Sequence, residues 1–238
     1  MKQVIFIIFC VVIYSCCYSQ NQQIRSIDSQ GAGWMNDLII TDYNGVPFKT
    51  YYDNVQGYPY LFEDWKFANI TLSKGKKFEK IKIRIDICKQ EVHFITTNNR
   101  EIVTPNGLIT EVTFIDSAFA NVNFFKLRAG FPPIDYQTEN NFYQLLSGGR
   151  IQLLKSVRKK IIQQKNDVSG ESVNIFDRYE DLYIFSNGQI KRLKKDKAFL
   201  LDQMNNQAEK MEEYIKANKV NLKNTDNLIR VFDYYNSL

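Results

Sequence analysis

Apolar and charged side chains alternate along residues 78–87, and this alternation restricts the fold more than any other feature of the chain. The isoleucines fall on one side of an extended backbone and the charged residues on the other: Ile81, Ile83, Ile85 and Ile87 against Lys80, Lys82, Arg84 and Asp86. A period of two residues is typical of an antiparallel strand with one buried face. The pattern predicts a strand here, paired through a turn at 88–90 with a second strand at 91–97.

Glycine-containing pairs recur between apolar runs at the spacing of hairpin turns. They are Asn44-Gly45, Lys74-Gly75, Asn106-Gly107, Gly148-Gly149 and Asn187-Gly188. Such pairs supply the positive backbone angles that two-residue hairpin loops require, so each predicts a hairpin. The last two lie in similar stretches, residues 145–155 and 184–194, which we interpret as a hairpin duplicated once.

Beyond residue 195 the apolar spacing changes to three and four residues, which predicts an amphipathic helix over 196–217. A shorter helix follows it, with Asn224 or Thr225 as its cap and Asp226 in its first turn. The apolar stripe of this second helix consists of Leu228, Val231, Phe232 and Tyr235. The fold class is therefore α+β: an antiparallel β meander of roughly eight to eleven strands, followed by a C-terminal helical hairpin. We expect residues 34–195 to form the β domain and residues 196–238 a helical tail packed on the sheet.

The first 19 residues have the pattern of a signal peptide. An apolar run at 4–13 follows Lys2 and is too short to span a membrane, and Cys17 and Ser19 suit a cleavage site that leaves Gln20 first. Residues 20–33 are polar and aperiodic, as in a linker. Cleavage would leave Cys88 as the remaining cysteine, so no intramolecular disulfide is expected. The alternative is a lipoprotein anchored through Cys16. Charged residues at 24% exclude a polytopic membrane protein.

Parts of the chain resemble uncharacterised exported proteins of Bacteroidota, for which no function is assigned. The likeness lies in the leader and in three segments: LLSGGRIQLLKSVRKKI, DRYEDLYIFSNGQIKRLKKDKAFLLD and YIKANKVNLKNTDNLIRVFDYYNSL. The resemblance implies an exported protein that is periplasmic or associated with the outer membrane. It carries no catalytic residue with it.

Residues suited to acid–base, nucleophilic or metal chemistry are scarce. His93 is the one histidine, and Cys88 with His93 is the one Cys–His pair left after cleavage. Zinc sites draw on several His or Cys ligands, and Asp177, Glu180 and Asp181 do not follow a calcium-loop pattern, so we predict no metal and no cofactor. The open enzymatic alternative is a carboxylate-based hydrolase acting on glycans. Its candidate pairs are Glu63 with Asp64, or Glu111 with Asp116.

Aromatic residues gather between positions 43 and 67. Such side chains either fill a core or form a stacking platform for sugars. The near-alternation of Tyr58, Tyr60 and Phe62 predicts a strand, which favours a role in the core.

Basic residues gather in and after the two similar hairpins. They are Arg150, Lys155, Arg158, Lys159, Lys160, Lys191, Arg192, Lys194 and Lys195. If the hairpins are neighbours, these residues could form one surface that binds an anionic polysaccharide or lipopolysaccharide. The other interpretation is that the lysines keep exposed strand edges from pairing with other chains. No nucleic-acid-binding module accompanies them, so no nucleic-acid partner is expected.

Together these features predict a non-enzymatic secreted or periplasmic envelope protein that acts by binding or assembly. Its partner is expected to be an anionic glycan or another envelope protein, and no transmembrane span is expected in the mature chain.

Overall fold

The computed structural model describes residues 25–26, 52, 54–96, 101–104, 106–115, 125–165 and 170–238. The expected signal peptide and linker, apart from the backbone of 25–26, and the expected Asn44-Gly45 turn lie outside these residues.

The strands of the described chain form one twelve-stranded, mostly antiparallel sheet. Their bounds are β1 Arg25–Ser26, β2 Val55–Gln56, β3 Lys66–Leu72, β4 Lys77–Asp86, β5 Glu91–Ile95, β6 Glu101–Thr104, β7 Ile109–Phe114, β8 Lys126–Arg128, β9 Tyr143–Ser147, β10 Gln152–Lys165, β11 Ser172–Ser186 and β12 Gln189–Arg192. The spatial order is β12-β11-β10-β9-β8-β7-β3-β4-β5-β6, with β1 parallel to β4 and β2 parallel to β11. The predicted α+β class, with a mostly antiparallel sheet before the helices, is confirmed.

The predicted strand pair at 78–87 and 91–97 corresponds to β4 and β5, which pair antiparallel. All four alternating isoleucines are buried. Gly-containing turns also join β3 to β4, β9 to β10, and β11 to β12, as predicted. Asn187 and Gly188 both have positive φ, 50° and 75°, as the preferred two-residue hairpin turn requires.

Two expected strand arrangements are wrong. The Asn106-Gly107 turn does not close a hairpin, because β7 pairs with β3 and β8 while β6 pairs with β5. Residues 58–62 are not a strand but an irregular segment whose one bridge joins Tyr60 to Asp86. This segment lies beside the end of β4, where β3 no longer covers that strand, and Leu61 N–H donates to Ile85 O.

The strands β7, β3, β4, β5 and β6 curl around one apolar core. Buried side chains from all five strands meet in it, among them Ile70, Ile83, Phe94, Ile102 and Val112. The order β7-β3-β4-β5-β6 puts three strands between β6 and β7, although these two strands are consecutive in the chain. Curling also explains how the short 105–108 connection can link β6 to β7.

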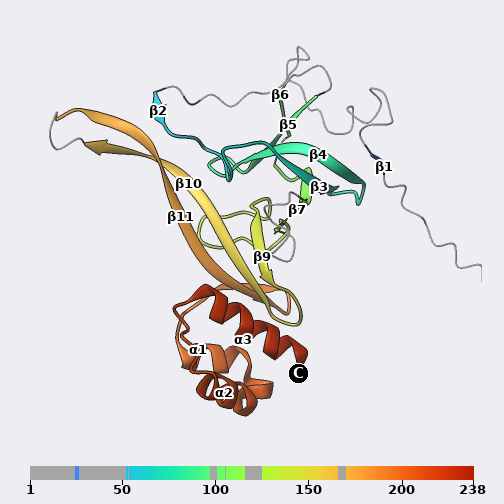
Figure 1. Cartoon of the computed structure of the whole chain (residues 1–238), viewed down its shortest axis with the longest axis vertical. Coiled ribbons are helices and arrows are strands. Elements are labelled where there is room, and N and C mark those ends of the chain that lie inside the picture. The colour runs from blue at the N-terminus through green and yellow to red at the C-terminus, as the bar shows by residue number, and fades with distance from the viewer. Residues whose placement is uncertain are drawn as a thin grey trace, which may run out of the picture.

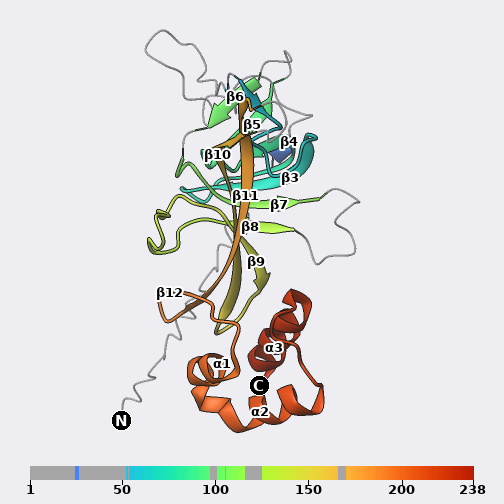
Figure 2. The same ribbon diagram turned by 90° about the vertical axis from the view of Figure 1, so that its left-hand side faces the viewer.

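The C-terminal helices pack beside the other end of the sheet (Figures 1 and 2). They are α1 (Lys197–Gln203), a 3₁₀ turn (Asn205–Gln207), α2 (Ala208–Ala217) and α3 (Thr225–Ser237). The predicted single helix over 196–217 is wrong, because it breaks at Met204, and the tail is not a two-helix hairpin. The predicted cap and stripe of α3 are confirmed: Asn224 Oδ1 accepts from Asn227 N–H, and all four stripe residues are buried. No helix in the described ranges is long and apolar enough to cross a membrane.

A long two-stranded arm crosses the molecule. Strands β10 and β11, of 14 and 15 residues, pair along their whole length, whereas β9 pairs with β10 only over Leu153–Ser156. One end of the arm lies beside the helices and the other extends past the sheet, with β2 alongside β11 (Figure 1). The middle of β10 rests on the β4–β5 turn, where Lys159 N–H donates to Ile87 O at 3.1 Å.

Candidate functional site

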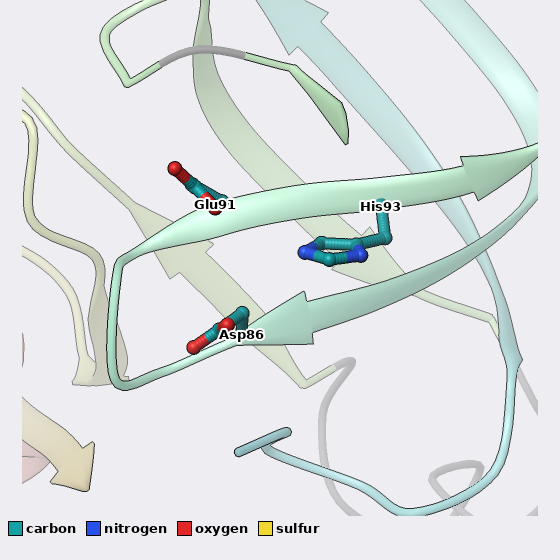
Figure 3. Close-up of side chains that lie close together, drawn as sticks. All are labelled: Asp86, Glu91 and His93. Carbon is teal, nitrogen blue, oxygen red and sulfur yellow. The ribbon is translucent and has the colours of Figure 1, made fainter. Parts of the chain in front are cut away.

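Charged and polar residues meet on the outer face of β4, β5 and β6. The register places Asp86 opposite Glu91, and Arg84 opposite His93. Side chains two residues apart share a face, so Asp86, Glu91 and His93 lie together (Figure 3). We call these three residues the Asp86–His93 cluster.

This face was expected to be solvated, but it is covered where the cluster lies. Asp86 and His93 are 0% and 1% exposed. The ring of Tyr60 packs edge-on against His93 with centroids 5.4 Å apart, and the Arg84 guanidinium lies 3.6 Å from the same tyrosine ring. Trp65 covers Arg84 further, at 4.5 Å. The side chains of Tyr60 and Trp65, from the aromatic segment before β3, therefore cover this part of the charged face.

Asp86 is held in place by three donors. Its Oδ1 accepts from the backbone N–H groups of Cys88 and Lys89 at 2.8 and 2.9 Å, and its Oδ2 accepts from the Tyr52 hydroxyl at 2.5 Å. Burial, and next the hydrogen bond to Asp86, raise the pKa of Tyr52 well above its ordinary value. Tyr52 is therefore a neutral donor that fixes the carboxylate.

His93 is anchored through one ring nitrogen only. Its Nδ1 lies 2.7 Å from Glu101 Oε1, and this hydrogen bond is the main reason why the pKa of Glu101 lies below its ordinary value. Nε2 is buried and has no hydrogen-bond partner in the described structure. Figure 3 shows this nitrogen pointing toward Asp86 and Glu91, and the ligand atoms of the three residues lie within 4.8 Å of one another.

The candidate Cys88–His93 pair is not engaged. Cys88 lies in the turn after Asp86, and the groups that act on its thiol are Tyr52, Asp86, Lys89 and Lys159. Burial raises the pKa of this thiol, which disfavours the nucleophilic thiolate.

The candidate anion-binding residues lie on neighbouring hairpins, as that hypothesis requires, because β10 pairs with β11. Carboxylates of β11 meet several of them: Lys155 pairs with Glu180 and Arg158 with Asp181, each at 2.5 Å, and Arg192 pairs with Asp181. Three others donate hydrogen bonds: Arg150 to Tyr235 O, Lys159 to Tyr58 O and Lys191 to Gln203. Lys160 lies over the Tyr179 ring, and Lys194 and Lys195 are exposed. Anion binding by this set stays a prediction.

The carboxylates considered for glycan hydrolysis do not gather in the described structure. Glu63 and Asp64 are exposed before β3. Glu111 on β7 is 3.0 Å from Lys126, and its expected partner Asp116 lies outside the described residues. A groove of about 390 Å³ lies between β9 and α3, where Ser147 Oγ donates to Asp233 Oδ1 at 2.6 Å.

Comparison with known proteins adds no relative: no family model, curated protein or solved structure matches this chain.

Proposed function

We propose that the protein is a non-enzymatic binding or assembly protein of the cell envelope, and that it meets another protein chain through the outer part of the β10–β11 arm. The observation that supports the proposal is the free edge of β10. Beyond its short pairing with β9, the outer edge of β10 has no strand partner among the described residues.

The backbone geometry identifies the groups that a partner strand would use. Lys159 N–H faces outward to Ile87 O, and by the two-residue period Ile161 and Gln163 present their N–H groups on the same side. An extended segment can add to such an edge by main-chain hydrogen bonds. Opposite this stretch, the other edge of the arm is covered only in part, because β2 pairs with Asn174 and Ile175 of β11.

The exposed side chains near the tip of β10 favour the interpretation that this edge binds another protein over the interpretation that it ends free in solvent. Ile161 is 43% exposed and is followed by the half-buried Ile162, so the arm presents apolar area near its tip. Lys160 and Lys165 flank this pair on the same strand, which favours an acidic partner segment and disfavours self-pairing of the edge. Tyr52 packs edge-on against Phe176 at 5.0 Å and holds the base of the outer arm against the body.

Site-specific photo-cross-linking in the native envelope tests this function. A cross-linker at position 163 should give one discrete adduct with another protein, and the matched position Lys210, exposed on α2, should give none. Gln163→Pro removes an outward N–H and should abolish an adduct formed from position 161, whereas Gln163→Ala should keep it. Equal labelling from positions 163 and 210 would refute the arm as the interface. Hydrolysis of a glycan by the purified protein, lost on substitution of one Asp or Glu, would replace the binding role by the enzymatic alternative.

A further inference from the structure

We infer that the Asp86–His93 cluster is a binding site for a divalent transition-metal cation of the zinc type, a role separate from the proposed interface. Two observations point to it. A nitrogen and two carboxylates from one hairpin offer ligand atoms within 4.8 Å of one another. His93 Nε2 is buried, has no hydrogen-bond partner in the described structure, and points into the space between the two carboxylates.

Glu101 gives His93 the tautomer that a metal requires. A carboxylate that accepts a hydrogen bond needs the proton on Nδ1, and neutral imidazole then carries a lone pair on Nε2. Metal-binding histidines are commonly oriented by a carboxylate on their other nitrogen in this way. A bare lone pair facing Asp86 and Glu91 calls for a positive charge between them, which a proton on Nε2 or a metal ion bound at that atom would supply.

The charges around the cluster allow such a cation. Arg84 precedes Asp86 by two residues on the same face of β4, and its guanidinium is paired with Glu101 at 3.1 Å. Lys159 approaches Asp86 from β10, but its amine donates to Tyr58 O. A divalent ion at Nε2 would offset the charges of Asp86 and Glu91 directly.

The donor set selects the class of metal. One imidazole nitrogen with two carboxylate oxygens suits Zn²⁺ and similar ions, whereas Ca²⁺ and Mg²⁺ take oxygen ligands. Zinc bonds of about 2.0–2.2 Å would draw the ligand atoms closer together than they lie here. Asp86 is fixed by Tyr52 and two backbone N–H groups, so zinc binding would require that movement of Glu91, which is half-buried and has the longer side chain.

Direct observation of the imidazole tests the site, because His93 is the one histidine in the 238-residue chain. The full chain is purified without an affinity tag, labelled with ¹⁵N-histidine and titrated with Zn²⁺ in a buffer that does not chelate metals. We expect a protonated Nδ1 before zinc is added. The Nε2 resonance should then shift to a metal-bound position and saturate at one equivalent. An imidazole that zinc leaves unchanged would overturn the site.

Calorimetric zinc titration of variants provides a readout that does not need His93 to be replaced. Glu91→Gln should lower zinc affinity at least tenfold, and Glu101→Gln should lower it by about 10- to 100-fold through loss of orientation. Glu63→Gln, an exposed glutamate elsewhere, is the matched control and should bind like the parent. Affinity that is the same in Glu91→Gln and Glu63→Gln would place any bound zinc elsewhere and refute the proposal. Circular dichroism of each variant confirms that it is folded.

Discussion

At the scale of the residue, Glu101 links the stability of the fold to pH. Its pKa lies below the ordinary value of 4.5 because of the hydrogen bond to His93, with Arg84 contributing as well. A carboxyl group whose pKa is depressed by folding stabilises the native state above its unfolded pKa, and this contribution disappears as the pH falls through the folded pKa.

Glu101→Gln should therefore flatten the acid side of the stability profile. Chemical denaturation between pH 3 and 7 should show a variant that is less stable than the parent by about 1 kcal/mol at neutral pH, with a difference that shrinks as the pH falls. Glu111→Gln, which loses a more exposed ion pair on β7, should leave the shape of the profile close to that of the parent. A Glu101→Gln profile parallel to that of the parent would contradict the role assigned to the His93 pair.

The strands that carry Asp86, Glu91 and His93 were predicted, but no site was predicted on them. The predicted strands at 78–87 and 91–97 already implied the shared face through the two-residue period. The burial of this face under tyrosine side chains could not be predicted, because Tyr52 and Tyr60 reach it by tertiary packing and not through any local sequence pattern. Sequence spacing also gives no sign that these three side chains lie together, because strand register brings them together.

At the scale of the element, Asn236 ties the end of α3 to the β9–β10 turn. Its Oδ1 accepts from Ile151 N–H at 3.2 Å, and its Nδ2 donates to Gly148 O and Ile151 O at 3.0 and 2.9 Å. Gly149 has φ of 138°, and a Cβ atom at that position would overlap the Asn236 side chain. Position 149 therefore requires glycine for two reasons: the turn needs its backbone conformation, and the Asn236 side chain approaches its Cα closely.

Asn236→Ala should destabilise the protein by about 2–3 kcal/mol, because it removes one acceptor and two donor contacts at a partly buried turn. Gly149→Ala should also destabilise it, through overlap and backbone strain. Urea denaturation monitored by circular dichroism measures both effects. Asn205→Ala, at an exposed position in the 3₁₀ turn, is the matched control and should change stability by less than about 0.5 kcal/mol. A similar small effect at Asn236 would show that the tie contributes little.

The helices differ in how well local pattern predicted them. The α3 stripe is continuous and its cap is an asparagine, so sequence located that helix correctly. The segment over 196–217 has the same apolar spacing, but consecutive asparagines follow Met204, and asparagine is a weak helix former. Asn206 accepts instead from the Tyr235 hydroxyl at 2.8 Å, a tertiary contact that helix periodicity could not reveal.

At the scale of the whole molecule, the order of the strands in the sheet could not be predicted from the residues of the turns. A Gly-containing turn predicts a local reversal, and Asn106-Gly107 was interpreted in that way. The partner of β7 is instead β3, about 40 residues earlier in the chain. That pairing depends on closing the curled core around Ile70 and Val112, which is a property of many strands together.

The sheet and the helices share a second core, which predicts one cooperative folding unit despite the separate appearance of the tail. Leu153 and Ile184 of the arm pack in one cluster with Leu200, Met211 and Phe232 of the helices. Phe232 is fully buried, so Phe232→Ala should cost about 3–5 kcal/mol.

The loss of stability caused by Phe232→Ala should be the same when it is measured at either end of the molecule. In a Trp34→Phe background, the fluorescence of Trp65, which lies against Arg84 of β4, reports the far end of the sheet, and circular dichroism at 222 nm reports the helices. We expect the two thermal transitions to fall together and by the same amount, because unfolding the helices uncovers the apolar base of β10 and β11. Phe67→Ala, at a side chain 48% exposed, is the matched control and should move both transitions only slightly. A helical transition that falls while the Trp65 transition stays in place would show that residues 196–238 are a separate module.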